Sequence, residues 1–224
     1  MIEAAALDGG ACVEDSMLAS FATAERRTHP YVNWRLEAVF PERTAEALAE
    51  LPIQAVDLGG VSGKRELHND QRSYFAGDVI ERHPVARALA EAFQSPRVAA
   101  AIMAQTGAQV AGCYLRIEYA IDISGFWLEP HTDLGVKTYT MLYQLGRRGQ
   151  EELGTDLYAD RRTWVERAPF GWNSALVFVP SDHSWHGFET RRIESPRRSI
   201  IVNYVTEAWR AREQLAFPER PIRV

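Results

Sequence analysis

The sequence predicts a mainly β domain with flanking helices (an α+β arrangement), whose core is a jelly roll or double-stranded β-helix of the cupin-like kind. Two observations lead to this prediction. The second half of the chain holds short runs of bulky and β-branched residues separated by turn signals, whereas helical patterns are confined to the first half. Strands at this spacing, preceded by helices, are typical of a jelly roll with N-terminal helical support. The clearest runs are 110–119, 138–145, 156–160, 174–180 and 199–205.

Helices are expected only before this strand-rich half. Residues 41–51 begin at a proline, stop before another proline and place apolar residues on one helical face. Residues 84–93 and 96–105 predict two more helices. Ser95 suits the N-cap of the second of these, and Gly107 suits its C-terminal stop. Their apolar faces are expected to pack on the outside of a sheet.

The chain divides into three predicted parts. Residues 1–27 show no firm period and are expected to form a loosely ordered arm, in which a short helix near residues 17–25 is one alternative. Residues 28–209 are expected to form one domain, in which 28–107 provide helical support and 108–209 form the jelly-roll core. Residues 210–224 contain two prolines and predict an extended C-terminal tail.

Composition limits the class of partner. The chain has 224 residues, 46% of them hydrophobic, which is enough for one sizeable core. A net charge of −5 gives no basic footprint for nucleic acid or for an anionic membrane. The two cysteines, Cys12 and Cys113, form no disulfide framework, and no apolar run approaches membrane-spanning length. We therefore expect a cytoplasmic protein without nucleic-acid or membrane partners, and the oligomeric state stays open.

Three potential metal ligands stand in the strand-rich half. Residues two apart in an extended strand point to the same side, so His131 and Asp133 can reach one point together. A second imidazole, His186, arrives from a distant strand. Two histidines and one carboxylate on one face of a metal leave positions open for substrate or oxygen, as in the facial triad of non-haem iron(II) oxygenases.

Simpler readings compete with this one. An H-x-D pair is a frequent accident of composition, and Asp133 could be a turn residue before Gly135. His183 and His186 form an H-x-x-H pair, which is a rival zinc-type motif. That spacing suits a helix, however, whereas this run is predicted to be loop and strand.

An arginine-rich strand follows His186. Residues 194–196 predict a turn, after which the chain returns from Arg197 onward. We expect the strands of His186 and Arg197 to be antiparallel neighbours, which would bring both residues to one cavity. Alternation places Arg197 and Ser199 on one face of the returning strand and Arg198 on the other.

Together these features resemble the 2-oxoglutarate- and iron(II)-dependent oxygenases, closest to the prolyl-hydroxylase-like branch. The resemblance covers about residues 119–203. Besides the three ligands it rests on Tyr119, Gly125, the strand 138–145, the G-T-D-L run of 154–157, Pro169, Gly171, the run 175–178, Arg197 and Ser199.

The resemblance implies roles for single residues. His131, Asp133 and His186 would hold Fe(II), with 2-oxoglutarate and O2 as co-substrates. Arg197 would bind the distal carboxylate of 2-oxoglutarate through its guanidinium fork, and Ser199 would add a hydroxyl donor.

Two assignments stay open beside these roles. Arg198 is the alternative to Arg197, and a solvated basic patch is the alternative to both. Tyr119 resembles the tyrosine that many relatives place near the co-substrate. Where some relatives carry another tyrosine, this chain has Gln144 with Tyr143 beside it.

The resemblance also favours a reaction type. Halogenating relatives have Gly or Ala two residues after the first histidine, whereas this chain has Asp133, which favours hydroxylation. The polar segment 62–74 is either a solvated surface loop or a substrate-binding loop. We expect a polar small-molecule substrate, such as a sugar, an amino acid or a natural-product intermediate. The alternatives are a hydroxylase of peptide or protein residues, a non-catalytic metal-binding jelly roll and, against the acidic balance, a nucleic-acid dealkylase.

Overall fold

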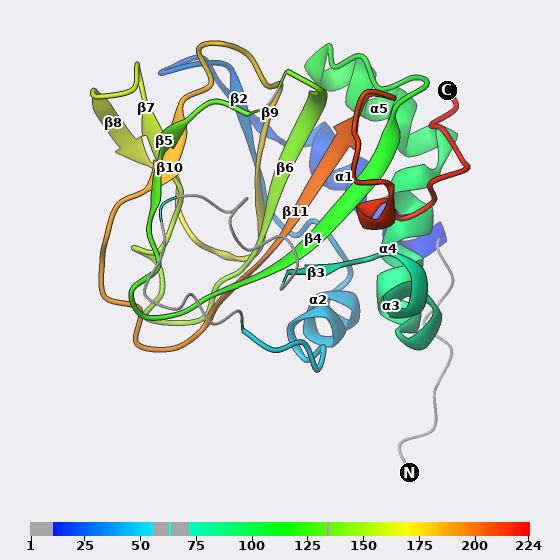
Figure 1. The fold of residues 1–224 in the computed structure, drawn as a ribbon, viewed down its shortest axis with the longest axis horizontal. Coiled ribbons are helices and arrows are strands. Elements are labelled where there is room, and N and C mark those ends of the chain that lie inside the picture. Colours follow the sequence, from blue (N-terminus) through cyan, green and yellow to red (C-terminus); the bar gives the residue numbers. More distant parts are fainter. Residues whose placement is uncertain (1–10, 56–62, 64–71, 134) are drawn as a thin grey trace.

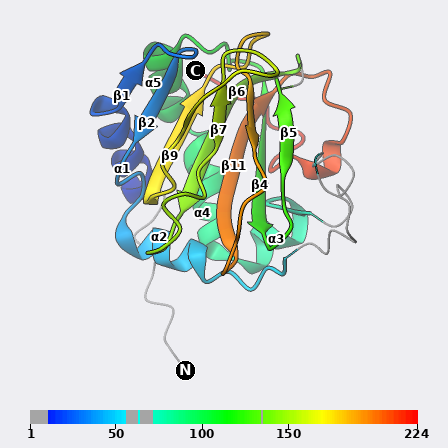
Figure 2. The ribbon, with the colours of Figure 1, turned by 90° about the vertical axis from the view of Figure 1, so that its left-hand side faces the viewer.

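Two antiparallel β-sheets face each other, and helices cover the outer face of the larger sheet (Figure 1). The computed structural model describes residues 11–55, 63, 72–133 and 135–224. Seen from the side of the smaller sheet, β5 and β7 lie in front of the strands of the larger one (Figure 2). The space between the two sheets is where side chains from both can meet.

The larger sheet has seven strands among the described residues, and every neighbouring pair is antiparallel. Its long central strands are β6, β11 and β4, so most of its surface is built by residues from the second half of the chain. In spatial order the strands are β1 (Glu25–Arg27), β2 (Asn33–Leu36), β9 (Trp172–Phe178), β6 (Lys137–Leu145), β11 (Arg197–Val205), β4 (Tyr114–Asp122) and β3 (Ser73–Tyr74).

The smaller sheet has four short strands, again all antiparallel. In spatial order they are β5 (Leu128–His131), β10 (His186–Phe188), β7 (Asp156–Tyr158) and β8 (Trp164–Arg167). In this register His186 stands opposite His131 on one side and Leu157 on the other. Two residues that are far apart in the sequence are therefore held side by side by backbone pairing.

Helices form over the three stretches 41–51, 84–93 and 96–105, as predicted, and two further helices are present among the described residues. They are α1 (Ala11–Ala22), α2 (Glu42–Ala49), α3 (Gly77–Arg82), α4 (Pro84–Gln94) and α5 (Pro96–Thr106), and a short 3-10 turn, η2 (Arg212–Gln214), lies near the C-terminus. The Ser95 side chain accepts a hydrogen bond from the Arg97 amide, so it caps α5 as predicted. Gly107 ends this helix in the left-handed conformation, with φ +76°.

Strand β11 shows how the two faces of the larger sheet differ. Ile200, Val202 and Tyr204 belong to the apolar core beneath the helices, and the Tyr204 hydroxyl donates to the Phe93 carbonyl of α4 over 2.6 Å. The alternate residues face the space between the sheets, and Arg197 and Ser199 line a cavity there. The alternation predicted for this strand is therefore confirmed.

The prediction of a mainly β fold with a jelly-roll core and N-terminal helices is confirmed, but both ends of the chain differ from expectation. The sequence predicted a loosely ordered arm over residues 1–27. Within it, residues 11–22 form α1, whose Met17 and Phe21 are buried in the core. The tail was predicted to be extended, but it contains the 3-10 turn η2 and packs against β4: the Ala216 amide donates to the Leu115 carbonyl over 2.9 Å.

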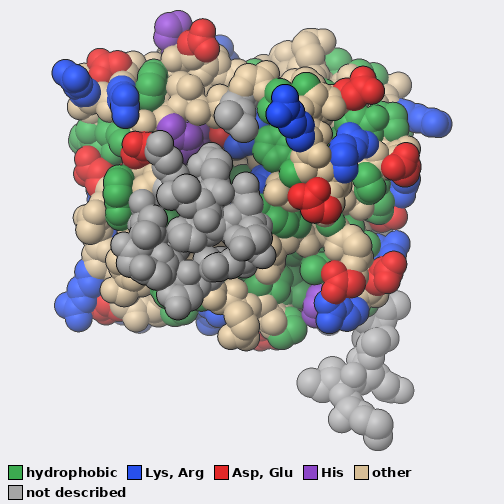
Figure 3. All heavy atoms as spheres, viewed as in Figure 1, with side chains coloured by type: hydrophobic (Ala, Val, Ile, Leu, Met, Phe, Trp, Pro, Cys, Tyr) green, Lys and Arg blue, Asp and Glu red, His purple; other side chains and the backbone are tan. Residues whose placement is uncertain are grey.

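Acidic and basic side chains are interspersed over the face drawn in Figure 3, without a field of one sign. Within the described part of the chain, no helix combines the length and the hydropathy that crossing a membrane requires.

Candidate metal site and its cavity

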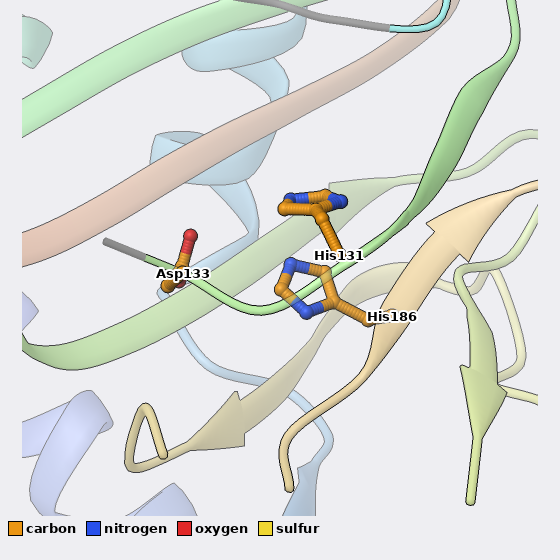
Figure 4. A group of neighbouring side chains, drawn as sticks. All are labelled: His131, Asp133 and His186. Carbon is orange, nitrogen blue, oxygen red and sulfur yellow. The ribbon is translucent and has the colours of Figure 1, made fainter. Parts of the chain in front are cut away.

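The three predicted ligands lie together between the sheets. His131 ends β5, Asp133 follows two residues later, and His186 begins β10. One ligand atom from each residue lies within 4.8 Å of the others. Their side chains point toward one another in Figure 4, and the centroids of the two imidazole rings are 4.4 Å apart. The smaller sheet thus supplies the histidines, and the loop after β5 supplies the carboxylate.

Backbone carbonyls orient both imidazoles. Nδ1 of His131 lies 2.9 Å from the Glu129 carbonyl oxygen, and Nδ1 of His186 lies 2.9 Å from that of Ser184. A carbonyl oxygen can only accept, so each Nδ1 carries the proton and each Nε2 keeps its lone pair. This arrangement is typical of metal-binding histidines, in which a hydrogen bond to the other ring nitrogen fixes the tautomer.

Asp133 is held from two sides. Its Oδ1 lies 2.5 Å from the Lys137 ammonium, and its Oδ2 accepts from the Thr140 hydroxyl over 2.7 Å. The side chain is 4% exposed. Burial raises the pKa of this carboxyl, but Lys137, His186 and the two hydrogen bonds outweigh burial and hold the pKa well below its usual range. Asp133 is therefore an anion at neutral pH, as a metal ligand must be.

A chain of hydrogen bonds continues from Asp133 into the larger sheet. The Asn203 amide donates to the Thr140 hydroxyl over 2.9 Å. Arg116 in turn donates from Nη1 to the Asn203 side-chain oxygen over 3.2 Å. Thr140, Asn203 and Arg116 stand opposite one another on β6, β11 and β4. The orientation of the carboxylate ligand is thus tied to the central strands of the larger sheet.

His186 also predicts a pH effect on the metal-free protein. Burial, with a smaller contribution from His131, lowers the pKa of His186 from 6.5 to about 4. The unfolded chain therefore takes up a proton between these pH values that the folded chain does not, and the free energy of unfolding falls as the pH falls through this window. The shift corresponds to about 3 kcal/mol.

Urea unfolding at several pH values, with a chelator present, measures this effect. We expect the wild-type protein to lose about 3 kcal/mol more than His186→Gln between pH 7 and pH 4. Parallel curves for the two proteins would contradict the assignment of a neutral, buried His186.

The metal-ligand cluster lines one cavity of about 470 Å³. Arg197 and Ser199 of β11 line it as well. The Arg197 guanidinium is buried, donating to Asp122 over 2.5 Å and to the Leu153 carbonyl over 2.6 Å. The other described residues lining this cavity are Gly63, Arg72, Arg116, Glu118, Phe126, Leu128, Glu129, Thr132, Lys137, Thr140, Leu142, Thr155, Gly187, Phe188, Ile201 and Trp209.

The strands that carry His186 and Arg197 are arranged differently from the prediction. The sequence predicted neighbouring antiparallel strands, but β10 belongs to the smaller sheet and β11 to the larger one. Eight residues separate the two strands (189–196), and this connection crosses from one sheet to the other. His186 and Arg197 therefore face the same cavity from opposite walls.

Tyr119 is not brought to the cavity. It lies on β4 with its side chain in the core beneath the helices, where its hydroxyl donates to the Leu48 carbonyl over 2.8 Å. Burial raises the pKa of this phenol to about 12, against a smaller opposing effect of Arg198. Arg198 thus lies on the same face of the larger sheet as Tyr119, whereas Arg197 lies on the face that lines the cavity.

Two further predictions concern Gln144 and Tyr143 of β6 and the polar segment 62–74. Gln144 stands opposite Ser199 and accepts from the Ser174 hydroxyl over 3.1 Å, whereas Tyr143 is in the helix-side core. Of the polar segment 62–74, Gly63 and Arg72 line the cavity, but residues 62 and 64–71 lie outside the described part of the chain.

The rival H-x-x-H pair does not form a metal cluster. His183 is exposed in the turn before β10. Across residues 11–55, 63, 72–133 and 135–224, the single grouping of three or more His, Cys, Asp or Glu side chains with metal-site spacing is His131, Asp133 and His186. Two imidazole nitrogens and one carboxylate oxygen suit a divalent first-row metal such as Fe(II), so the donor set fits the predicted ion.

Sequence reasoning missed four polar residues of the cavity wall. They are Lys137, Thr140, Arg116 and Glu118. A signal for the last two was present, because β4 alternates charged residues with Leu115, Ile117 and Tyr119 in an otherwise apolar strand. Such alternation marks a strand with one apolar face and one polar face.

Comparisons with known proteins agree with this architecture. No family model and no curated protein matches the chain. Among solved structures it is similar to a prolyl 4-hydroxylase from Phytophthora capsici, with a TM-score of 0.58 and 13% identity over 88% of this chain and 65% of the other. A prolyl hydroxylase from Trichoplax adhaerens, in complex with a hypoxia inducible factor peptide fragment, gives 0.56 and 15% over 88% and 91%.

A third similar structure is an oxidoreductase of the 2OG-Fe(II) oxygenase family from Burkholderia pseudomallei. It gives a TM-score of 0.54 and 16% identity over 84% of this chain and 90% of the other. At these identities the likeness shows the fold: the chain has the double-stranded β-helix of 2-oxoglutarate- and iron-dependent oxygenases. The resemblance identified in the sequence is confirmed at that level.

Proposed function

We propose that this protein is an Fe(II)- and 2-oxoglutarate-dependent dioxygenase. The observation that carries the proposal is the meeting of His131, Asp133, His186 and Arg197 on the walls of one cavity. When bound there, Fe(II) would supply the activation of O2 that couples decarboxylation of 2-oxoglutarate to succinate with oxidation of a substrate C–H bond. The chain's own residues bind, orient and enclose the reactants.

The metal ligands set the charge of the site. Two neutral imidazoles and the Asp133 carboxylate leave a divalent ion with a net charge of about +1, which favours chelation by an anionic 2-oxo acid. Lys137 and Thr140 hold Asp133 in place. Because Asp133 occupies the third protein position, we propose hydroxylation as the reaction.

Arg197 and Ser199 are proposed to bind the distal carboxylate of 2-oxoglutarate. Both line the cavity from the same face of β11. Asp122 and the Leu153 carbonyl fix the plane of the guanidinium, and the Phe170 and Phe188 rings lie 4.6 and 5.0 Å from its central carbon. A rigid guanidinium in an apolar setting suits bidentate binding of a carboxylate. Tyr119 has no place in this proposal, because it faces the helices.

The substrate is proposed to be a polar small molecule. The cavity volume of about 470 Å³ falls in the range of ligand pockets. Its walls combine charged groups with Leu142, Ile201 and Phe188, which shield the reaction from water. A hydroxylase of peptides is the competing proposal, and turnover of peptides but not of small molecules would favour it.

Succinate formation tests the proposed reaction. Purified protein supplied with Fe(II), 2-oxoglutarate and O2 is expected to form succinate slowly without substrate and faster with it. Asp133→Ala is expected to form none above the rate of free Fe(II). Equal succinate from the wild-type and variant proteins would contradict the proposed site.

Exchange of neighbouring arginines tests the co-substrate site. We expect Arg197→Gln to raise the KM for 2-oxoglutarate by about tenfold or more, since a hydrogen bond between charged groups contributes about 1.5–3 kcal/mol. Arg198→Gln removes the same charge from the opposite face of β11 and is expected to leave this KM unchanged. A KM raised only in Arg198→Gln would show that the other face binds the co-substrate.

A further inference from the structure

An ammonium group contacts the carboxylate that is proposed to bind the metal. Nζ of Lys137 lies 2.5 Å from Oδ1 of Asp133. Lys137 is the first residue of β6, and its side chain lines the cavity together with the three metal ligands. The Lys137 side chain is 16% exposed and that of Asp133 is 4% exposed, so water and salt screen this pair only weakly.

Both oxygens of Asp133 have a partner, but the two partners differ in charge. Oδ1 pairs with the Lys137 ammonium, and Oδ2 accepts from the Thr140 hydroxyl over 2.7 Å. A metal ion that binds Asp133 shares the carboxylate with both groups. The hydroxyl is neutral and leaves the charge of the carboxylate to the ion, whereas the ammonium already neutralises part of that charge and repels a second cation.

The repulsion between Lys137 and a bound ion is large enough to measure. Divalent ions lie about 2.0–2.6 Å from their oxygen ligands, so an ion on either oxygen of Asp133 comes close to the ammonium. In a partly buried site at such short range, one unit charge changes an equilibrium constant by about tenfold or more. Lys137 therefore holds Asp133 in place and at the same time lowers the affinity of the site for a divalent ion.

The same charge has the opposite effect on the co-substrate. 2-Oxoglutarate is a dianion, and its keto oxygen and near carboxylate are proposed to chelate the ion. A carboxylate bound to that ion is attracted by the Lys137 ammonium, because the ion itself is bound beside it. The charge that opposes binding of the ion therefore favours binding of the anion that follows.

The other charged side chains of the cavity do not enter this comparison. They are of both signs: Arg72, Arg116, Arg197, Glu118 and Glu129. All of them are the same in the wild-type protein and in a variant of Lys137. The difference in affinity between the two proteins therefore depends on the charge of Lys137 and not on the sum of the charges around it.

We propose that Lys137 acts in opposite directions on the two partners of the metal site: it weakens binding of the divalent ion alone and strengthens binding of 2-oxoglutarate to the ion-loaded protein. This inference rests on the proposed function, since it requires that ion and that co-substrate in the cavity. Retention of the ion then depends on the supply of 2-oxoglutarate, because a ligand that binds the loaded form opposes loss of the ion by mass action.

Two calorimetric titrations measure the two effects without turnover. Chelator-treated protein is titrated with Mn(II), and Mn(II)-saturated protein is then titrated with N-oxalylglycine, an unreactive analogue of 2-oxoglutarate. Lys137→Met has an uncharged side chain of nearly the same length. We expect this variant to bind Mn(II) about tenfold more tightly than the wild-type protein and to bind N-oxalylglycine more weakly by about threefold or more.

The opposite signs distinguish the charge of Lys137 from a structural role. Loss of support for Asp133 would weaken both binding steps, whereas loss of a charge strengthens the first and weakens the second. Lys137→Arg keeps the charge and is expected to retain both wild-type affinities. Thr140→Val removes the neutral partner of the same carboxylate and is expected to bind Mn(II) no more tightly than the wild-type protein.

Arg192→Gln is the matched control for net charge. It removes one positive charge from a side chain that is 85% exposed and is not among the described residues lining the cavity, and we expect it to change neither affinity. Urea unfolding of the metal-free protein shows whether Lys137→Met is folded. If it is not, Lys137→Gln, a second neutral variant that can still donate to Asp133, is expected to give the same two changes.

The outcomes separate this inference from the proposed function. Unchanged or weaker Mn(II) binding in the folded neutral variant would overturn the inference alone, as would undiminished binding of N-oxalylglycine. No binding of Mn(II) by the wild-type protein would overturn the proposed metal site and the inference together. Binding of Mn(II) without binding of N-oxalylglycine would overturn the proposed co-substrate and, with it, the inference.

Discussion

Replacing His186 with alanine is expected to weaken divalent metal binding by more than about a hundredfold and to abolish turnover. Loss of a residue that merely supports a ligand typically costs 10–100-fold in affinity or activity, and loss of a ligand costs more. His186 is 5% exposed, and its ring is held by the Ser184 carbonyl beside His131. Calorimetric titration of the chelator-treated protein with Mn(II) measures the loss.

His183 provides the matched control. It lies three residues earlier and is exposed. His183→Ala is expected to bind Mn(II) as the wild-type protein does, and urea unfolding of both variants shows whether the fold is retained. Wild-type affinity in a folded His186→Ala would remove this residue from the metal site.

Replacing Asp156 with alanine is expected to destabilise the fold by about 3–5 kcal/mol, the usual cost of removing one partner from a buried ion pair. This side chain is fully buried in the smaller sheet. Its carboxylate accepts from Arg167 over 2.9 Å, from the Glu189 amide over 2.8 Å and from the Arg191 guanidinium. The Trp164 indole also donates to it over 3.2 Å, and all four donors lose this partner in the variant.

The Asp156→Ala substitution is expected to disturb the metal site as well. Asp156 stands opposite Gly187, the residue after His186, so it anchors the strand that carries this ligand. We expect weaker Mn(II) binding in Asp156→Ala, together with a lower urea midpoint. Asp156→Asn, which keeps the shape, should lose less stability, and the exposed Asp182→Ala should change it by less than about 0.5 kcal/mol. A midpoint for Asp156→Ala equal to that of Asp182→Ala would contradict this role.

Strand periodicity explains why much of the site could be predicted. The face of β11 follows from alternation alone, so Arg197 and Ser199 could be assigned to the cavity and Arg198 to the other side before the structure was known. The same rule brought His131 and Asp133 to one point. These residues belong to regular strands or lie within two residues of one.

Which of the two sheets each strand belongs to could not be predicted in the same way. The turn before Arg197 suggested a hairpin, but a connection between two sheets has the same local turn chemistry as a hairpin between neighbours. Tyr119 was assigned by resemblance, whereas its face is decided by the register of β4, in which Arg116 and Glu118 point to the cavity. Register depends on the complete sheet rather than on the local sequence.

Helix α1 was predicted only as a short helix near residues 17–25, whereas it spans Ala11–Ala22. Val13, Met17 and Phe21 are buried at a spacing of four residues, which is helical. Small residues between them blur the contrast between the two faces, and the segment gains most of its stability from packing on the core. The polar cavity residues, such as Lys137, were missed because their partners lie on other strands.

The central claim is that one cavity holds Fe(II) and 2-oxoglutarate together, and an anaerobic visible absorption titration tests it most directly. Metal-free protein receives Fe(II) and then 2-oxoglutarate, with His186→Ala and Arg197→Gln run alongside. We predict a metal-to-ligand charge-transfer band that needs both components, is absent in His186→Ala and requires more 2-oxoglutarate in Arg197→Gln. No band in the wild-type protein, with tight retention of zinc instead, would contradict the account and leave a metal-binding jelly roll without this chemistry.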